Sequence, residues 1–305
     1  MRANTVYVLS RDPLVVAGGF GTIETLKAVD RPFTLIYHNC GLIRAHHLSR
    51  YMTWGRAFSG KRRLVVVTNE PAEARWLRLV GIDSHSLSHN IHVREGFFSP
   101  DPECGKRYDA VYAAQLASFK RLGLAKGIHR LFVMTYVGGG AQWDLHEYEP
   151  SLSHASFNRT WVPPEGVRDV YRASHVGLAL SSKEGAMFAS MEYLMTGLPV
   201  VTTRNRGGRN RYLTRLNSRF VAANPDAVAR AVSDLAASPP DPMEIRREVL
   251  GLVRRDRHAY VEMLRQRCSM PMASADSAVE QLWGGEQGIE KHSMPIQYFI
   301  DSTLS

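Results

Sequence analysis

The 305-residue chain has few features of membrane-spanning, secreted or metal-stabilised proteins. Its cysteines, Cys40, Cys104 and Cys268, are far apart and form no Cys-x-x-Cys pair, which argues against a disulfide framework and a structural zinc site. No apolar run approaches the roughly 20 residues that span a bilayer. The first strand-like segment, Thr5–Leu9, is too short for the apolar core of a signal peptide. These absences make a reducing cytoplasm the expected location.

Several signatures of catalysis and binding are missing as well. The chain has no Walker loop, no Gly-x-Ser-x-Gly elbow, no serine–histidine–aspartate order and no His-Glu-x-x-His pair. Because the twelve histidines lack the spacing of metal ligands, we predict no catalytic metal. Helix-turn-helix, RNP and zinc-finger patterns are also absent, so nucleic acid is not the expected partner.

Arginine supplies most of the net charge of +9. Its clusters include residues 61–63, with one lysine, and the four arginines between 204 and 211. Such patches bind phosphorylated ligands, anionic membrane surfaces or nucleic acid. Because nucleic-acid motifs are missing, the expected partners are a diphosphate-bearing ligand or a lipid-linked molecule at a membrane face, where peripheral contact would need the same charge.

Residues 176–203 carry most of the functional information. An apolar strand over Val176–Leu180 ends in small polar residues, and a helix is expected to open at Glu184 and end at Gly197. A second apolar strand, Pro199–Thr203, follows at once. Strand, helix and strand in so few residues predict a right-handed βαβ unit. Its first loop should lie at the carboxyl edge of a parallel sheet, where open α/β folds bind ligands.

The helix of this unit is predicted to bury one face and leave a glutamate outside it. Glu192 lies off the apolar stripe, eight positions after Glu184, and is available to face a ligand. The alternative is an ordinary Rossmann-type unit with two solvated glutamates. The expected buried face consists of Met187, Met191, Leu194 and Met195.

Together these residues resemble the glutamate–seven–glutamate signature of the GT-B fold, GT4-like (group 1) retaining glycosyltransferases. The resemblance implies an α/β protein with two Rossmann-like domains facing a cleft. It also implies transfer of a sugar from a nucleotide-diphosphate sugar, with retention and with neither a metal nor another cofactor. The matching residues are Ser181, Glu184, Gly185, Glu192, Gly197, Pro199, Val200 and Val201.

The resemblance assigns roles to this loop and helix. Glu184 would contact the hydroxyls of the donor sugar and is the first catalytic candidate, and Glu192 would hydrogen-bond the ribose hydroxyls. Backbone N–H groups at Gly185, Ala186 and Met187 would hold the diphosphate at a helix N-terminus. Fixed dipoles and cations would then stabilise the leaving group without a metal.

A second segment resembles the family's Gly-Arg-Leu-x-x-x-Lys-Gly turn, in which an arginine and a lysine hold the diphosphate. Lys120 falls at the lysine position, but Gln115 replaces the arginine and supplies neither charge nor a bidentate fork. Arg121, Arg204 or Arg206 is expected to compensate. The alternative is that Lys120 and Arg121 form a solvated helix face.

The N-terminal part offers two further candidates. Gly18 and Gly19 lie between the first strand and a helix expected over 22–28, and they resemble the family's glycine loop that faces the diphosphate; a simple turn is the alternative. His38 ends a strand expected over 34–37 and is the second catalytic candidate, because family members often carry a histidine near the sugar. A structural histidine is the alternative.

Three parts are expected along the chain. Residues 1–100 would form a reduced, acceptor-side Rossmann-like domain, and 101–267 the nucleotide-sugar-binding domain. The tail, 268–305, is expected to be loosely ordered and to pack back on the N-terminal domain. Strands of the second domain are expected at 109–114, 131–135, 159–162, 176–181, 199–203 and 219–221.

Two rival functions stay open from the sequence. A GT-B sugar-nucleotide epimerase would share the donor contacts but use no acceptor. A non-catalytic GT-B module that supports a partner enzyme would account for Gln115. The acceptor of a transferase would be a saccharide, a lipid-linked molecule or a natural-product aglycone.

Overall fold

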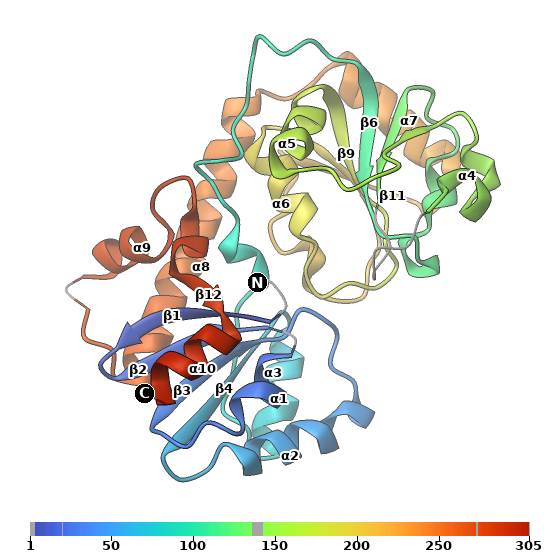
Figure 1. The fold of residues 1–305 in the computed structure, drawn as a ribbon. Helices are drawn as coiled ribbons and strands as arrows, with labels where there is room; N and C mark the ends of the chain where they lie inside the picture. The colour runs from blue at the N-terminus through green and yellow to red at the C-terminus, as the bar shows by residue number, and fades with distance from the viewer. Residues whose placement is uncertain (1–3, 20, 136–142, 273, 305) are drawn as a thin grey trace. The chain divides into compact units, whose positions relative to one another are not determined.

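A computed structural model describes residues 4–19, 21–135, 143–272 and 274–304. Within these residues the chain is α/β, with two six-stranded sheets, and it divides into two compact units (Figure 1). One unit comprises Met1–Phe97 and Val253–Ser305, and the other comprises Phe98–Leu252. Helix α8, Pro242–Cys268, therefore belongs to the second unit in its first part and to the first unit in its remainder.

The sheet of the first unit has the strand order β12-β1-β2-β3-β4-β5. Strands β2 to β5 are parallel to one another, whereas β1 is antiparallel to both β2 and β12. The strands are β1 Thr5–Arg11, β2 Leu14–Gly18, β3 Phe33–His38, β4 Arg62–Thr68, β5 Ser84–Ser86 and β12 Ser293–Pro295. The apolar runs in β2, β3 and β4 are almost wholly buried, as expected for parallel strands that are covered on both faces.

The segment expected to be a loop after the first strand contains a strand of its own. Strand β2 forms a hairpin with β1, in which Arg11 pairs with Leu14. The apolar residues 14–17 occupy the place between β1 and β3, so the glycine pair lies at the end of the second strand, which Gly18 ends and Gly19 follows, and not after the first. Phe20, in the same expected loop, lies outside the described residues.

The helices of the first unit come from both ends of the chain. They are α1 Thr22–Leu26, α2 Leu48–Ala57, α3 Pro71–Leu79, α9 Ala275–Trp283 and α10 Ile296–Leu304, with the later part of α8. The prediction of a loosely ordered tail is wrong, because β12 pairs with β1. Ile296 and Phe299, three residues apart on α10, join the core of the unit.

The later part of α8 joins the first unit through polar contacts that the sequence did not indicate. The Arg257 guanidinium is buried and donates hydrogen bonds to the carbonyl oxygens of Ile91 and Val93 and to the Glu95 carboxylate. The sequence predicted that this stretch belongs to the second domain, because the helical pattern continues without a break to residue 267. The contacts that join it to the first unit involve residues far away in the chain.

The second unit is a parallel sheet of order β11-β10-β9-β6-β7-β8. Its strands are β6 Tyr108–Ala113, β7 Leu131–Met134, β8 Ser156–Phe157, β9 Ser174–Ala179, β10 Val200–Thr203 and β11 Ser218–Val221. Its helices are α4 Leu145–Tyr148, α5 Pro164–Arg172, α6 Phe188–Met195 and α7 Pro225–Ala237, with the first part of α8.

One strand of this unit was predicted at the wrong place. The short strand β8 lies at 156–157, whereas residues 159–162 form no strand. The segment leads into Pro163 and Pro164 at the start of α5, and proline cannot donate to a strand ladder. The other five predicted strands correspond to observed strands, with ends that differ by a few residues.

The predicted βαβ unit is present as β9, α6 and β10, with the two strands adjacent and parallel. The predicted buried face of α6 is confirmed, since all four of its residues are buried. The helix begins at Phe188, three residues later than Gly185, because the residues before it form a loop tied to neighbouring loops. No helix in the described part of the chain is long and apolar enough to cross a membrane.

Gly177 allows α6 to pack closely against β9. A β-carbon at this position would lie 2.3 Å from Cδ2 of the Tyr193 ring, and the backbone of a central strand cannot shift without cost. We expect Gly177→Ala to lower the free energy of unfolding by about 1–3 kcal/mol, measured by chemical denaturation. Gly251→Ala is the matched control, because a β-carbon there meets nothing within 4 Å and alanine favours helix. Equal midpoints for wild type and Gly177→Ala would contradict this account.

Candidate functional site

Three loops of the second unit are joined at the carboxyl edge of its sheet. They follow β6, β9 and β10. The Ser182 N–H donates to the Phe119 carbonyl at 2.8 Å, the Glu184 N–H donates to the Arg206 carbonyl at 2.8 Å, and the Arg206 N–H donates to the Ser182 carbonyl at 2.9 Å. The first of these bonds links residues 63 positions apart, and the other two link residues 22 and 24 positions apart. Together they hold Glu184 in a loop rather than in a helix.

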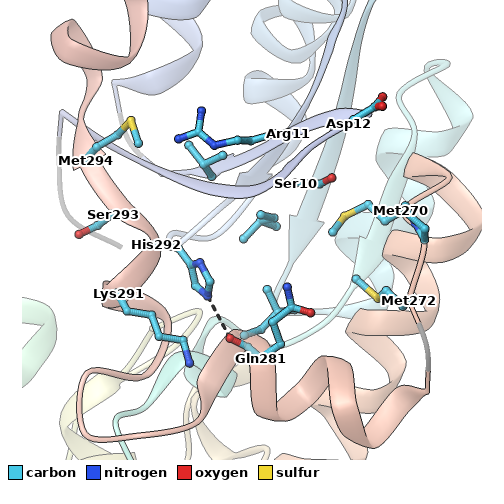
Figure 2. Close-up of a pocket in the computed structure, with 14 residues that line it drawn as sticks. Ser10, Arg11, Asp12, Met270, Met272, Gln281, Lys291, His292, Ser293 and Met294 are labelled. Carbon is cyan, nitrogen blue, oxygen red and sulfur yellow. Dashed lines mark hydrogen bonds between the residues drawn. The ribbon is translucent and has the colours of Figure 1, made fainter. Parts of the chain in front are cut away.

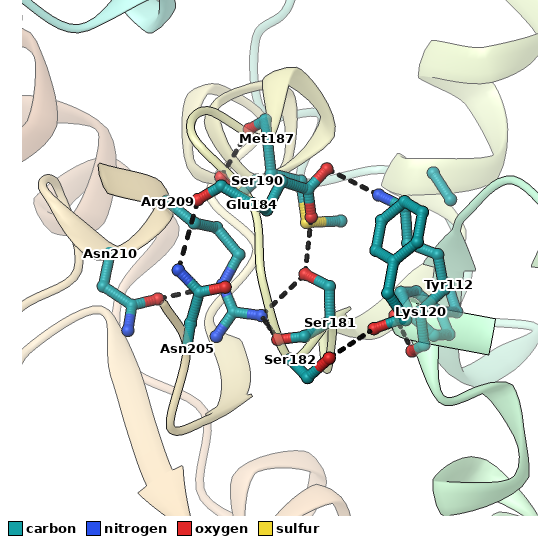
Figure 3. Close-up of polar contacts among 12 residues, drawn as sticks. Tyr112, Lys120, Ser181, Ser182, Glu184, Met187, Ser190, Asn205, Arg209 and Asn210 are labelled. Atoms are coloured by element: carbon teal, nitrogen blue, oxygen red, sulfur yellow. Dashed lines mark hydrogen bonds and ion pairs between the residues drawn. The ribbon is translucent and has the colours of Figure 1, made fainter. Parts of the chain in front are cut away.

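The Glu184 carboxylate is the centre of this edge (Figure 3). Lys120 Nζ lies 2.5 Å from Oε1, and the Ser181 hydroxyl donates to Oε2. The side chains of Lys120 and Glu184 are only 9% and 15% exposed, so water screens their attraction weakly. The alternative of a solvated helix face is therefore wrong for Lys120.

Arg121 lies beside this pair but points to the strand ends. Its Nε donates to the Leu180 carbonyl at 2.7 Å, and Nη2 donates to the Thr203 hydroxyl at 2.5 Å. The guanidinium therefore braces the ends of β9 and β10. Desolvation lowers the pKa of Arg121 below its ordinary value. An arginine is nevertheless charged at neutral pH.

The four arginines after β10 have different environments. Arg204 and Arg206 are exposed, as a ligand contact would require. Arg209 is buried and donates to Ser181 (Figure 3). It also donates to Thr202 and Thr203. Sequence reasoning did not single out Arg209, because nothing in the arginine spacing shows which side chain turns inward.

Glu192 lies on α6, and a buried tyrosine orients its carboxylate. The Tyr171 hydroxyl donates to Glu192 Oε2 at 3.0 Å, a contact not predicted from the sequence. Burial, with the Glu192 carboxylate beside it, raises the pKa of Tyr171 well above its ordinary value, so the hydroxyl remains a donor. As predicted, Glu192 lies outside the buried face of α6.

The start of α6 suits an anion. The N-cap residue Met187 contributes no side-chain hydrogen bond to the first turn, so no side chain at that position competes for its N–H groups. Gly185 is buried, and Ala186 is partly exposed. Helix N-termini attract phosphate oxygens through the N–H groups of the first turn and through the helix dipole.

Comparison with known proteins identifies this unit. Residues 116–238, which contain Lys120, Glu184 and Glu192, match the family model described as Glycosyl transferases group 1. The match covers most of the second unit, Phe98–Leu252. No curated protein sequence matches the chain significantly.

Solved structures agree with this family match on the fold. HepE from Anabaena in complex with UDP has 13% identity and a TM-score of 0.59, over 81% of this chain and 75% of that one. AviGT4, a glycosyltransferase involved in avilamycin A biosynthesis, has 17% identity and a TM-score of 0.57, over 81% and 77%. Sucrose-phosphate synthase from Thermosynechococcus elongatus has 14% identity and a TM-score of 0.59, over 81% and 70%. These structures confirm the predicted GT-B fold, and the family match over residues 116–238 agrees with the predicted resemblance to group 1 glycosyltransferases.

The glycine pair of the first GT-B unit has a clear steric role. A β-carbon at Gly18 would lie 2.5 Å from Cγ2 of Thr22, and the Thr22 hydroxyl donates to the Gly19 carbonyl at 2.7 Å. The pair therefore permits a tight turn from β2 into α1. This packing requirement stands beside the predicted phosphate role, which stays a prediction.

His38 of the first GT-B unit is not accessible to a substrate in this structure. It is 1% exposed, and its Nε2 lies 2.9 Å from the Tyr260 hydroxyl. The predicted catalytic role does not fit this burial, whereas the structural alternative does. The strand end was identified correctly, but the covering residue belongs to α8, more than 200 positions later.

His38, His89 and His92 form a buried cluster, the one group of potential metal ligands found among the described residues. Their ligand atoms lie within 4.8 Å of one another. Trp283 Nε1 donates to His92 Nδ1 at 3.1 Å, so a neutral His92 carries its proton on Nε2. That nitrogen then has no lone pair for a metal, and ligating histidines usually donate, rather than accept, through the second nitrogen. We therefore assign no metal to the cluster.

A cavity of about 540 Å³ opens on the first unit (Figure 2). None of the predicted site residues lines it. Two of its polar side chains are already paired with carbonyl oxygens, Lys291 with Gly284 at 2.8 Å and His292 with Gln281 at 3.1 Å. The cavity therefore offers no convergent set of polar groups comparable to the Glu184 site.

The buried histidines predict a specific loss of stability in mild acid. Burial lowers the pKa of His38 to about 3 and those of His89 and His92 well below the ordinary value. Below a pH of about 6.5, the unfolded chain binds protons that the folded chain excludes. The free energy of unfolding should therefore fall as pH decreases toward 3, by up to about 1.4 kcal/mol per pH unit for each histidine. The titratable and polar groups packed around these histidines are Tyr260, Trp283 and the Arg257–Glu95 pair.

Chemical denaturation at pH 7.5 and 5.5 measures this slope. His38→Gln should destabilise the protein at pH 7.5 yet show a shallower loss between the two pH values. His46→Gln, an exposed position in the same unit, should retain the wild-type slope. If both variants retain it, the buried cluster is not the source of the acid sensitivity.

Proposed function

We propose that the protein transfers a sugar from a nucleotide-diphosphate sugar to an acceptor, with retention and without a metal or another cofactor. The observation that carries the proposal is the shielded Lys120–Glu184 pair within the region that matches group 1 glycosyltransferases. Glu184 of this pair lies on the loop before α6, the helix that carries Glu192. The structure of HepE, which has the same fold, holds UDP, and this supports a nucleotide-linked donor.

The donor would bind along the loop after β9. Glu192, oriented by Tyr171, would accept hydrogen bonds from the ribose hydroxyls, and Glu184 would accept from the sugar. The N–H groups from Gly185 to Met187 would face the diphosphate. Lys120 has three N–H donors, so it can hold Glu184 and a phosphate oxygen together.

In the proposed reaction, the bond between the anomeric carbon and the β-phosphate oxygen breaks. The acceptor oxygen bonds to the same face of that carbon, and its proton passes to the departing phosphate. Lys120 and the start of α6 would stabilise the charge that develops on the diphosphate. Fixed charges in a site shielded from water act strongly because they need no reorganisation.

A panel of UDP-, GDP- and TDP-sugars tests the proposal by calorimetry and by nucleotide release, with and without EDTA. At least one donor should bind, and its turnover should survive EDTA. Loss of activity on chelation that Mg²⁺ or Mn²⁺ restores would overturn the metal-free mechanism. A modified sugar nucleotide formed without an acceptor would indicate an epimerase, and the absence of any donor binding would indicate a non-catalytic module.

Glu192→Ala should weaken binding of that donor by about 1.5–3 kcal/mol, because a charged hydrogen bond is lost. Glu192→Gln keeps an acceptor for the Tyr171 hydroxyl and serves as the variant that protects the fold. Glu244→Ala removes an exposed glutamate of the same unit and should leave the affinity unchanged. Unchanged affinity in both Glu192 variants would remove this residue from the donor site.

The exposed arginines Arg204 and Arg206 are proposed to supply the phosphate contact that Gln115 lacks. Arg204→Ala or Arg206→Ala should weaken nucleotide-sugar binding by about 1.5–3 kcal/mol, with little effect on nucleoside binding. Gln115→Arg should partly restore the affinity. Arg230→Ala, an exposed arginine of α7, controls for net charge. Wild-type affinity in both variants would assign these arginines to an anionic acceptor or a membrane surface instead.

A further inference from the structure

Arg209 is a buried cation, and among the described residues no ion pair or hydrogen bond joins its guanidinium directly to a carboxylate. It is 1% exposed, and every hydrogen bond described for its side chain goes to a neutral oxygen. Burial lowers its pKa to about 10, so it remains charged at neutral pH. A buried charge is costly unless its surroundings satisfy it, which indicates that this guanidinium serves a specific purpose.

The guanidinium connects strand ends to the Ser181 side chain. Nη2 donates to the Thr202 hydroxyl at 2.8 Å and to the Thr203 carbonyl at 2.6 Å. Nη1 donates to the carbonyl and to the hydroxyl of Ser181 at 2.6 and 2.8 Å. One planar group thereby holds the ends of β9 and β10 in a fixed relation.

The contact with Ser181 sets the direction of a hydrogen bond to Glu184. The Ser181 Oγ atom accepts from Arg209, so the hydroxyl proton is turned toward Glu184 Oε2 (Figure 3). Lys120 holds the other carboxylate oxygen. Hydrogen bonds in such chains strengthen one another in a low-dielectric interior, and the plane of the Glu184 carboxylate is thereby fixed from both sides.

We infer that Arg209 is a positioning residue of the donor-sugar site, which acts on Glu184 through the Ser181 hydroxyl. The inference deepens the proposed function and rests on it for the role of Glu184. Arg209 and Ser181 themselves need not touch the donor. Their effect is to keep the carboxylate in one orientation before a sugar arrives, which matters when binding groups must be preorganised.

Ser181→Ala separates positioning from bracing. It removes the hydroxyl between Arg209 and Glu184, but it leaves the bonds from Arg209 to the Ser181 backbone, Thr202 and Thr203 in place. We expect kcat for the best donor of the panel to fall at least tenfold, while affinity for the corresponding nucleoside diphosphate, which lacks the sugar, changes less than twofold. Thr202→Val removes the bond from Arg209 to the Thr202 hydroxyl and the bond from that hydroxyl to the Ala179 carbonyl. It leaves the relay, so kcat should stay within twofold of wild type.

Variants at Arg209 give the second readout. Arg209→Lys keeps the charge and should retain more of kcat than Arg209→Met, when both are compared at equal folded fractions. If Ser181→Ala retains wild-type kcat and the wild-type ratio of donor to nucleoside diphosphate affinity, Arg209 is only a brace and the inference is wrong. This failure differs from that of the proposed function, in which the wild-type protein itself binds no donor.

A double-variant cycle tests the relay without any sugar nucleotide. The shift in denaturation midpoint for Ser181→Ala with Glu184→Ala should be smaller than the sum of the two single shifts, because both variants remove the same hydrogen bond. The pair Thr202→Val with Glu184→Ala should give additive shifts. Additivity in the first pair would overturn the relay.

Discussion

Backbone hydrogen bonds among the loops after β6, β9 and β10 are the constraint on which the candidate site depends. Where the loop after β9 meets the one after β10, bonds run in both directions between residues 182–184 and Arg206. They delay the start of α6 to Phe188 and leave Glu184 in an irregular segment. Irregular backbone can present N–H groups and a side chain to a ligand together. The later start of α6 therefore leaves the loop around Glu184 in a conformation that can bind a ligand.

The electrostatics of the site depend on unequal burial of similar side chains. Lys120 and Arg209 are buried near one carboxylate, that of Glu184, while Arg204 and Arg206 remain exposed. The buried cations orient the carboxylate, and the exposed ones are available to a ligand. An excess of positive charge at the carboxyl edge of a parallel sheet suits a diphosphate. The basic composition of the chain thus has a local explanation in this unit.

The first unit uses its buried polar groups in a different way. Three neutral histidines form a buried cluster against the later part of α8, from which Arg257 pairs with Glu95. Tyr260 and Trp283 hydrogen-bond to two of these histidines. The interior of this unit is therefore held partly by hydrogen bonds between segments far apart in the sequence, and those bonds require the histidines to stay uncharged.

Local patterns in the sequence determined most of the elements and the family. Apolar runs predicted five of the six strands of the second unit, and the spacing of Met187 and Met191 predicted the buried face of α6. The two glutamates with the Gly-x-Pro-Val-Val strand were sufficient to indicate a group 1 glycosyltransferase, because each part of that pattern has a local structural cause. The hairpin of β1 and β2 and the ordered tail were missed, since both depend on pairing between strands.

The tertiary structure alone decided which side chains act together. Only one arginine of the loop 204–211 contacts the oxygens of Ser181 and Thr203 and is buried. The spacing of the arginines in the sequence does not show which one. Burial of His38 likewise depends on Tyr260, contributed by a helix more than 200 positions later. Local sequence sets propensity and periodicity over a few turns. The free energy of placing a charge or a polar ring depends on desolvation and on partners that only the folded chain brings near.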